Sequence, residues 1–305
     1  MVEVAHHRFG AMGTDVHIVV VGGDEPAAPL AARAEDEIRE REARWSRFLS
    51  TSELSRLNAA DGAPVVLEPD TYALVELAVH WWRGTDGLFD PTVLDALIAA
   101  GYDRSHESVV GRDLPDRPAP SAVPGPGEIE FDVRRRSVRL PRGIHLDLGG
   151  IGKGHAADVV SDSLIASGAA GALVNMGGDL HARGQPPEGD LWVVGIDVEP
   201  AVEVAVGHGA VTTSTTLRRH WTVAGRPMHH LIDPRTGVPA EGGLATVSVI
   251  AADAASAEVL AKAVLVTGLA DGAELLARYG VTGLAVGDDG TVTRFAGFDE
   301  YEVRR

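Results

Sequence analysis

The strongest candidate for a binding site in this sequence is a glycine-rich bend that ends in a lysine, residues 149–153. Gly149, Gly150 and Gly152 let backbone N–H groups approach a ligand closely, and the free N–H groups of a helix N-terminus favour an anion. Lys153 adds a positive charge that the helix dipole disfavours, so we expect a carboxylate or another anion beside it. This chemistry suits a phosphate or pyrophosphate. A tight strand-to-helix turn with a solvated lysine explains the same residues.

Two known nucleotide-binding motifs can be compared with this bend. A P-loop needs glycine at position 147 and Ser or Thr after the lysine, whereas the chain has Asp147 and Gly154. A degenerate dinucleotide fingerprint, G-x-G-x-x-A, fits Gly152, Gly154 and Ala157. That fingerprint also needs a βαβ unit with an acidic residue after its second strand, and Asp179 lies at roughly the right place. The P-loop is therefore excluded, and the dinucleotide fingerprint stays a minor alternative.

A second candidate is the segment HHLIDPRTGVPA, residues 229–240. Asp-Pro, Thr-Gly and a further proline force a compact turn with exposed backbone groups. A turn alone needs neither the pair His230 and Asp233 nor an arginine within it, so we expect this segment to have a function. His220 and His229 are more typical of surface histidines.

The apolar pattern predicts the elements that hold these residues. Ile144, Leu146 and Leu148 alternate as in a half-buried strand, and Lys153–Leu164 continues at helical spacing. Other predicted strands are 15–21, 171–176, 192–197, 202–206, 210–213 and 246–251, with hairpins at 128–140 and 283–295. Predicted helices are 29–48, 50–58, 71–82, 254–266 and 270–279. Antiparallel hairpins mixed with helices indicate an α+β fold and not a repeating βαβ fold.

Three polar residues are predicted to act at helix ends or on a helix face. Asp90, just before Pro91, is predicted to cap a helix whose first turn contains Thr92. Glu258 and Lys262 are four residues apart on the helix 254–266 and are predicted to form an ion pair, which on an exposed face contributes only about a few tenths of a kcal/mol.

Composition restricts the classes of partner. The chain has 305 residues, no cysteine and a net charge of −17, so thiolate chemistry is excluded and a nucleic-acid or anionic-membrane surface is not expected. No apolar run is long enough to span a membrane, and the first residues carry no secretory signal, so we expect a cytoplasmic location. Residues 103–127 are rich in proline and charge and are predicted to form a long surface loop.

Five segments together resemble the flavin transferases of the ApbE type, the FAD:protein FMN transferases. They are MGT (12–14), GLFDPTV (87–93), DLGGIGKGHAAD (147–158), ALVNMGGDL (172–180) and HLIDPRTG (230–237). The resemblance extends from Met12 to Gly268. It implies one ApbE-like domain over residues 1–305 with a T-fold-like α+β architecture. It also implies a metal-assisted transfer of FMN from FAD to a Thr or Ser hydroxyl of a target protein, with release of AMP.

The resemblance also implies roles for single residues. Lys153 and the glycine bend would lie at the FAD pyrophosphate, His230 would be the general base, and Asp233 and Thr236 would hold the turn that presents it. The residues implied to contact FAD are Met12, Gly13, Thr14, Asp90, Thr92, Asp147, Gly149, Gly150, Lys153, Gly177, Gly178, Asp179, Arg235 and Thr236. Asp147 could instead fix the backbone N–H groups of its own turn.

Two positions depart from the family pattern. The resemblance implies Mg²⁺ held by the Gly152 carbonyl and by an Asp and a Thr four residues apart, where this chain has Glu258 and Lys262. A longer carboxylate still binds Mg²⁺, but an ammonium group cannot be a ligand. Thr215 stands where the family has a glycine. Three hypotheses follow: a Mg²⁺-dependent transferase, a transferase or FAD pyrophosphatase in which Lys262 replaces part of the metal's charge, and an FAD-binding protein without turnover.

Overall fold

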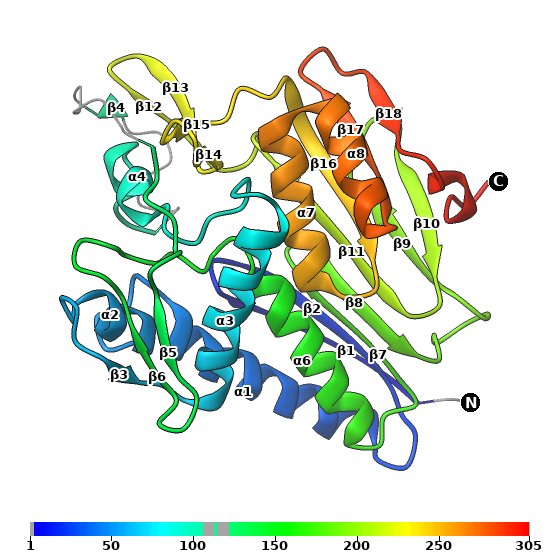
Figure 1. Ribbon diagram of the computed structural model, residues 1–305. Helices are drawn as coiled ribbons and strands as arrows, with labels where there is room; N and C mark the ends of the chain where they lie inside the picture. Colours follow the sequence, from blue (N-terminus) through cyan, green and yellow to red (C-terminus); the bar gives the residue numbers. More distant parts are fainter. Residues whose placement is uncertain (1–2, 106–112, 115–121, 305) are drawn as a thin grey trace.

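The computed structural model describes residues 3–105, 113–114 and 122–304, and an eight-stranded sheet lies at its centre (Figure 1). The strand order is β1-β2-β7-β8-β11-β16-β17-β18, and every neighbouring pair is antiparallel. The bounds are Val4–Ala11 (β1), Thr14–Val21 (β2), Gly171–Met176 (β7), Asp179–Gly184 (β8), Gly209–Thr215 (β11), Leu244–Ala251 (β16), Thr282–Gly287 (β17) and Val292–Arg294 (β18). The predicted α+β class with mostly antiparallel sheets is confirmed.

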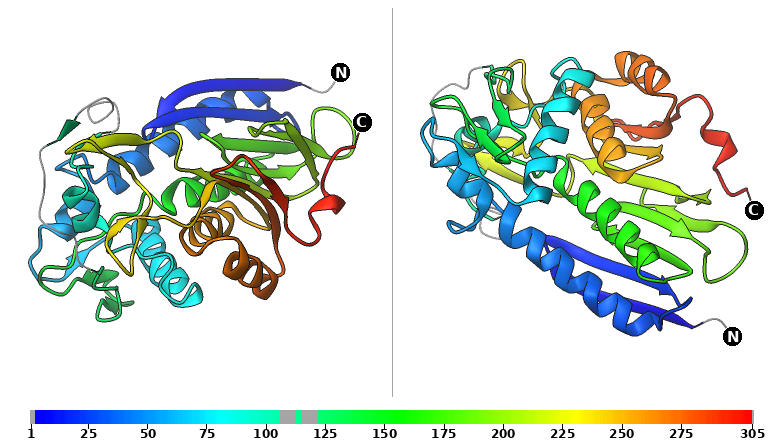
Figure 2. Two further views of the ribbon diagram at one scale, coloured as in Figure 1. Left: turned by 90° about the horizontal axis from the view of Figure 1, so that it is seen from above. Right: turned by 60° about the horizontal axis from the view of Figure 1, so that its bottom comes forward.

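Three helices lie side by side across one face of this sheet (Figures 1 and 2). They are α1 (Ala27–Trp45), α6 (Gly152–Ala166) and α7 (Ala254–Thr267). Alternate strand residues such as Ile18, Val174 and Val247 are buried beneath them and form the main core. The helices α3 (Pro69–Gly84) and α8 (Leu269–Tyr279) pack against α1 and α7. This arrangement brings the N-termini of α6 and α7 together and places Lys153 of α6 at the start of β8.

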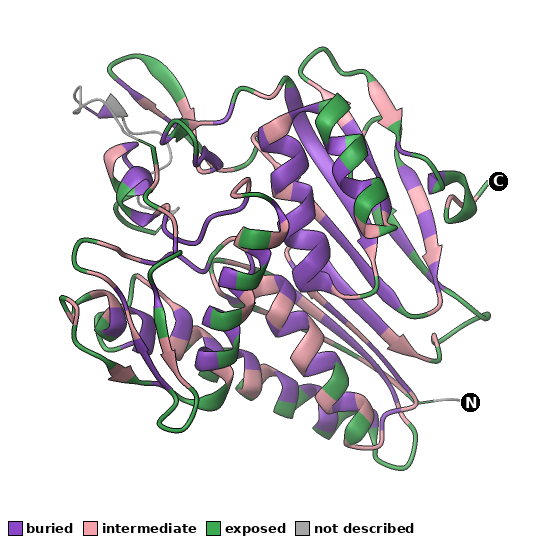
Figure 3. Ribbon diagram, in the orientation of Figure 1, coloured by how far each residue is buried: buried purple, intermediate pink, exposed green. Residues whose placement is uncertain are grey.

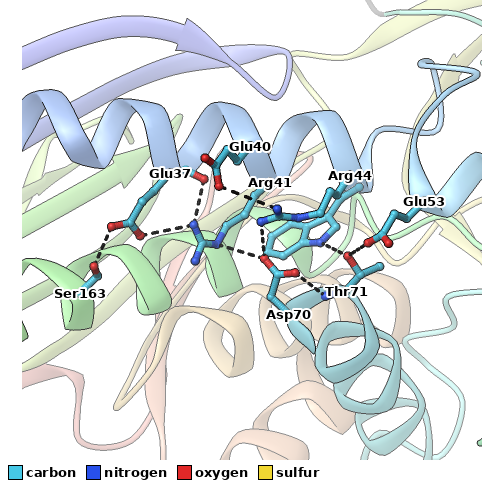
Figure 4. A network of polar contacts seen from close by, with 9 residues as sticks. Glu37, Glu40, Arg41, Arg44, Glu53, Asp70, Thr71 and Ser163 are labelled. Carbon is cyan, nitrogen blue, oxygen red and sulfur yellow. Dashed lines mark hydrogen bonds and ion pairs between the residues drawn. The ribbon is translucent and has the colours of Figure 1, made fainter. Parts of the chain in front are cut away.

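A network of polar contacts joins α1 to α3 and α6 (Figure 4). Arg44 donates from Nη2 to Asp70 Oδ2 at 2.6 Å, and Ser163 donates to Glu37 Oε1 at 2.7 Å. Arg41 lies between them and donates to the Glu37 carbonyl oxygen at 2.9 Å. We call these residues, together with Glu40 and the Glu53–Thr71 pair, the α1–α3 network.

The opposite face of the sheet is covered by a separate two-stranded ribbon, β9 (Trp192–Ile196) and β10 (Val202–Val206). Val19, Val211 and Ile250 point to this side and form a second core cluster with the ribbon. The sheet therefore has an apolar layer on each face, with the polar candidate residues at one of its ends.

Short elements gather at that end of the sheet, on the left in Figure 1. They are α2 (Glu53–Asn58), β3 (Val65–Val66), α4 (Leu94–Ala99), β4 (Asp113–Leu114), β5 (Glu130–Asp132), β6 (Ser137–Arg139), β12 (His220–Val223), β13 (Arg226–His229), β14 (Ile232–Asp233) and β15 (Val238–Pro239), while the 3₁₀-helix η1 (Phe298–Glu300) lies near the C-terminus. A small apolar cluster that includes Leu97, Trp221 and Ile232 holds α4 against β12 and β14.

The prediction of a strand over Ile144–Leu148 was wrong. Leu146 and Leu148 are buried as the alternation indicates, but the segment pairs with no strand among the described residues. The backbone of Leu146 bonds to a side chain instead, since Asn58 accepts from Leu146 N at 2.8 Å and donates to Leu146 O at 2.9 Å. The bend is therefore reached by an extended segment held from α2.

Two further predictions need correction. Asp90 does not cap a helix, since α4 begins only at Leu94; its carboxylate accepts from the Thr92 N–H at 2.7 Å and closes a local turn. The dinucleotide fingerprint also fails, because β7 after α6 is antiparallel to both its neighbours and no βαβ unit forms there.

Several short stretches of the chain were incompletely predicted, and the hairpin of β12 and β13 was not predicted at all. The pattern did not indicate β1, which pairs with β2 through the two-residue turn Met12–Gly13. Most of the predicted loop 103–127 lies outside the described residues, but Asp113–Leu114 forms β4, which pairs in parallel with β12. Within the described part of the chain, no helix combines the length and the apolar character needed to cross a membrane. The cytoplasmic location stays a prediction.

Candidate functional site

The first turn of α6 places Lys153 between two buried carboxylates. Its ammonium group donates to Asp179 at the start of β8 and to Glu258 Oε1 on α7, the latter at 2.6 Å. The N–H of Gly154 donates to the other Glu258 oxygen at 2.8 Å. The carboxylate expected beside this lysine is therefore present twice, which offsets the unfavourable helix dipole.

Lys262 adds a second ammonium group to the same carboxylate. Its Nζ lies 2.9 Å from Glu258 Oε1, which confirms the predicted ion pair one helical turn apart. The face that carries the pair is not exposed, because α7 is apolar all round and lies buried between the sheet and its neighbours (Figure 3). The Glu258 side chain is 0% exposed. We call Lys153, Asp179, Glu258 and Lys262 the Glu258 cluster.

Burial and mutual attraction shift the pKa values within the Glu258 cluster in opposite directions. Burial alone would raise the pKa of Glu258, but the two ammonium groups lower it to about 2. Burial alone would lower the pKa of Lys153, but attraction to Asp179 and Glu258 raises it. For Asp179 and Lys262 burial prevails, so the pKa of Asp179 is raised and that of Lys262 is lowered. Glu258 is therefore the firmly ionised centre of the cluster.

The glycines of the bend allow close packing between α6, α7 and the bend itself. A Cβ atom added to Gly154 would lie 2.4 Å from the carbonyl oxygen of Ala254, so the two helix N-termini touch through their backbones. At Gly150 an added Cβ would lie 2.9 Å from Phe89 and 3.5 Å from Cδ of Lys262. The aliphatic part of Lys262 thus lies directly against the bend.

Two tight turns meet beside the cluster. Met12 and Gly13 both have positive φ angles, 51° and 66°, as a type I′ hairpin turn requires. Gly177 also has a positive φ angle, and a Cβ atom on it would collide with the hydroxyl of Thr14. Gly178 follows with open space around it. The structure thus brings together the MGT and MGGD segments, which are predicted to line the ligand.

Asp90 and Thr92 lie in a turn that is bonded to the segment before the bend. The carbonyl oxygen of Pro91 accepts from the Asp147 N–H at 2.8 Å. The Asp90 carboxylate is buried, which raises its pKa, and it accepts from both N–H and Oγ1 of Thr92. Phe89 of the same turn packs on Gly150.

Asp147 is engaged by the protein itself. Its Oδ1 accepts from the Gly149 N–H at 2.6 Å, and its Oδ2 lies 2.6 Å from Arg47 Nε. Arg47 also lies over the Tyr102 ring, with its guanidinium carbon 4.8 Å from the ring centre. Asp147 therefore holds a backbone N–H group of its own turn, which is the alternative to direct contact with a ligand.

The charges of Lys262 and Lys153 in the Glu258 cluster act on the pKa of His230. Burial lowers the pKa of His230 well below 6.5, and repulsion from Arg219, Lys262, His229 and Lys153 lowers it further. Its Nδ1 atom is buried and has no hydrogen-bond partner among the described residues. The imidazole is thus neutral at neutral pH and has a nitrogen that the surrounding protein does not use.

The turn after His230 is held by its own side chains. The Asp233 carboxylate accepts from the backbone N–H and the guanidinium of Arg235, and its carbonyl oxygen accepts from the Thr236 N–H at 3.1 Å. His229 is half-buried and lies 3.1 Å from the Ala240 carbonyl oxygen, whereas His220 is exposed. These bonds hold the turn after His230, and the role of Asp233 and Thr236 in presenting His230 stays a prediction.

Sequence reasoning missed the position of Arg219. Its Nη2 donates to the Gly13 carbonyl oxygen at 3.3 Å, and its charge acts on Lys153, Tyr102 and His230. The run Arg218–Arg219 signalled a local positive charge but gave no indication of what it would face. At Thr215 the hydroxyl donates to the Ala245 carbonyl oxygen at 3.0 Å within the sheet region.

Two cavities in the described part of the chain lie elsewhere. One of about 220 Å³ is lined by residues that include Asn58 and Gly143, and one of about 340 Å³ by residues that include Pro29 and Arg33. Neither is lined by a predicted site residue. The candidate site is therefore defined by its charged groups and glycine turns.

Comparison with known proteins decides the family. The sequence pattern of the ApbE family matches residues 12–285. The chain is 32% identical to the FAD:protein FMN transferase of Treponema pallidum, over 92% of this chain and 83% of that protein. It is 30% identical to the FAD:protein FMN transferase of Salmonella typhimurium, over 88% of this chain and 80% of that protein.

The chain belongs to the ApbE family. Solved ApbE structures have the same architecture. The ApbE protein of Thermotoga maritima superposes with a TM-score of 0.85 at 27% identity, over 99% of this chain and 100% of that chain. The flavinyl transferase ApbE of Pseudomonas stutzeri, in its apo form, gives a TM-score of 0.83 at 28% identity, over 98% and 96% of the two chains. The resemblance drawn from the five motifs is confirmed, and all five lie within the part that matches the ApbE pattern.

Proposed function

We propose that this chain is an FAD:protein FMN transferase that acts as one ApbE-type unit. It would move FMN from FAD to a Thr or Ser hydroxyl of a target protein and release AMP. The printed function of its relatives supports the reaction type. The proposal rests on Lys153 and Lys262, which lie at the glycine bend, and on His230, whose pKa their charges lower, because an FAD diphosphate needs cations and an acceptor hydroxyl needs a base.

The reaction exchanges one P–O bond for another. The acceptor hydroxyl oxygen forms a bond to the phosphorus of the FMN half, and the bond from that phosphorus to the bridging oxygen breaks. AMP leaves with the bridging oxygen and its electron pair, and the hydroxyl proton passes to His230. A neutral imidazole can accept it, and the negative charge of a bound diphosphate would raise the low pKa of His230 and make it a stronger base.

The cationic groups would bind the diphosphate and stabilise the charge that develops on it. Lys153, Lys262 and Arg219 come from α6, α7 and the segment between β11 and β12, so they surround the bend from different elements. The N–H group of Gly150 would add a hydrogen bond to a phosphoryl oxygen, whereas the Gly149 N–H is held by Asp147.

The remaining residues would contact the ends of FAD and hold the site. Asp233 and Thr236 would keep His230 in place through their turn. Contacts with the flavin, ribityl or adenosine parts are proposed for Met12, Gly13, Thr14, Asp90, Thr92, Gly177, Gly178, Asp179 and Arg235. Asp147 would act through Gly149, whose N–H it holds.

Mg²⁺ does not fit the residues where the family resemblance places it. The two oxygens of Glu258 already accept from two ammonium groups and the Gly154 N–H. A divalent cation there would lie next to two positive charges, and Lys262 offers it no ligand. No step of the proposed reaction is therefore derived through a metal at Gly152 and Glu258.

The test separates the transferase from its two alternatives. Purified protein is incubated with FAD and with the proteins encoded beside its gene, and the products are followed by mass spectrometry and chromatography. A transferase gives a covalent mass increase of FMN minus water on one of those proteins and an equal amount of AMP. Equal free FMN and AMP without modified protein indicates an FAD pyrophosphatase, and retained FAD without AMP indicates a binding protein. Either of these two results contradicts the proposal.

The role of His230 is tested in the same assay. His230→Gln is expected to lower the transfer rate by about 10²–10⁴-fold, because the hydroxyl loses its base. His229→Gln is the matched control, since the neighbouring histidine lies against Ala240 and is expected to keep most of the rate. Equal loss in both variants would point to a damaged turn.

A further inference from the structure

The Glu258 cluster contains as much positive as negative charge. Lys153 and Lys262 supply two positive charges, and Asp179 and Glu258 supply two negative charges. Both lysine side chains are about 85% buried, since 14% and 15% of their surfaces are exposed. The cluster therefore has no surplus negative charge to attract a divalent cation.

The position of the Lys262 ammonium group is fixed by the fold. Asp158 on α6 accepts from the N–H groups of Ala254 and Ala255 at 2.7 and 2.9 Å, which ties the first turn of α7 to α6. Lys262 lies two turns further along this buried helix, with its aliphatic part against Gly150 and its Nζ on Glu258. A positive charge is thus built into the bend.

We propose that the Lys262 ammonium group takes the place of a divalent cation and that this chain transfers FMN without a metal ion. The inference rests on the proposed function. As the acceptor oxygen bonds to the FMN phosphorus and AMP leaves, Lys262 and Lys153 face the negative charge on the phosphoryl oxygens, and His230 takes the hydroxyl proton. The Lys262 ammonium group then supplies the positive charge that a bound metal ion would otherwise supply to the phosphoryl oxygens.

Metal binding is measured first, without FAD or acceptor. Metal-free protein is titrated with Mn²⁺, and the unbound ion is counted by its electron paramagnetic resonance signal. The wild type and Lys262→Arg are expected to bind no Mn²⁺ at this site. Lys262→Thr removes the ammonium group and supplies a hydroxyl oxygen, so it is expected to bind one ion per chain, and the further change Glu258→Gln is expected to abolish that binding.

Two results of the titration would overturn the inference. One is a Mn²⁺ ion bound by the wild type and lost in Glu258→Gln. The other is a Lys262→Thr protein that unfolds at the same temperature as the wild type and still binds no ion.

Activity is measured second, in EDTA and in Mg²⁺. The wild type is expected to keep its transfer rate within about twofold in EDTA, whereas Lys262→Thr is expected to lose about 10²-fold in EDTA and to regain activity with Mg²⁺. Wild-type transfer that stops in EDTA and returns with Mg²⁺ contradicts the inference while upholding the transferase. If no protein is modified under any condition, the proposed function fails, and the Mn²⁺ titration still decides the role of Lys262.

Discussion

The α1–α3 network and the Glu258 cluster both pair carboxylates with cations, but they differ in the kind of cation and in the burial of the carboxylate that the cations share. In the network, the Asp70 and Arg44 side chains are 23% and 26% exposed, and guanidinium groups supply the positive charge (Figure 4). In the cluster, Glu258 is fully buried and both positive charges are ammonium groups. A planar guanidinium fits a carboxylate in one geometry, whereas an ammonium is a point charge that can turn its three donors toward a new anion.

The difference indicates which network is structural and which one is prepared for a ligand. The α1–α3 network lies between helices, and its donors bond to other side chains and to a carbonyl oxygen. Nε of Arg41 and Nε of Arg44 are buried without a hydrogen-bond partner among the described residues. In the Glu258 cluster, Asp179 Oδ1 is buried and has no hydrogen-bond partner among the described residues. The Nδ1 atom of His230, whose pKa is lowered by Lys262 and Lys153 among others, is also buried without a partner. Unpaired buried atoms therefore occur in both regions, and the Glu258 cluster is distinguished by its position at the glycine bend, where a ligand can pair with them.

The largest expected effect comes from removing the centre of the cluster. Glu258→Gln leaves two buried ammonium groups without their shared carboxylate, and we expect it to lower the free energy of unfolding by about 3–5 kcal/mol. Urea denaturation followed by circular dichroism measures this change. A loss below about 1 kcal/mol would show that the cluster contributes no more to the free energy of unfolding than the α1–α3 network does.

The same pair of proteins sharpens the comparison as the pH is lowered. The pKa of Glu258 is about 2 in the folded chain against 4.5 ordinarily, so its contribution is present above about pH 4.5 and is lost as the pH falls toward 2. We expect the stability difference between wild type and Glu258→Gln to shrink in this range, by up to about 3 kcal/mol. Asp179 works in the opposite direction, because burial raises its pKa, and Asp179→Asn is the control for its share. A stability difference between wild type and Glu258→Gln that stays constant with pH would contradict the lowered pKa of Glu258.

A smaller effect is expected at the edge of the site. Arg219→Gln removes a positive charge that acts on Lys153 and His230, and we expect FAD to bind about tenfold more weakly, about 1.4 kcal/mol. Arg218→Gln is the matched control, because Arg218 is exposed and pairs with Asp197. Fluorescence titration of the flavin measures both. Equal affinities in the two variants would remove Arg219 from the site.

The smallest effect is expected in the α1–α3 network. Asp70→Asn weakens the contact with Arg44 and the favourable charge in the first turn of α3, and we expect a loss of about 0.5–1 kcal/mol with no change in transfer rate. Glu40→Gln serves as its control, since Glu40 is 67% exposed and lies 3.8 Å from Arg44, and is expected to change nothing measurable. A transfer rate that falls in Asp70→Asn would contradict the separation of the two regions.

The sequence predicted most elements, because they depend on local patterns, whereas the roles of the site residues stay a prediction. Apolar spacing located α6 and α7, and the glycine bend with its lysine indicated an anion site that needs carboxylates nearby. What failed depends on distant partners. The strand expected at Leu146 is replaced by bonds to Asn58, 88 residues away in sequence, and no local pattern announces such a partner.

The burial of the Glu258–Lys262 pair could have been predicted from the composition of the helix around it. A charged pair on an exposed helix face has little desolvation cost. Residues 254–266 have no polar face that could expose the pair to water, since alanine, leucine and valine predominate on every side of the helix. A single ion pair in such a helix indicates buried charge. Arg219 is a different case, because a run of two arginines cannot tell which of them faces the ligand.

The backbone contact between Gly154 and Ala254 has a consequence for the evolution of metal use. Since α6 and α7 touch without intervening side chains and Asp158 fixes their register, the space at position 262 is held by the scaffold whatever side chain fills it. Lysine and threonine codons differ by a single base. A lineage could therefore gain or lose dependence on a dissolved ion in one mutational event, with no rebuilding of the surrounding helices.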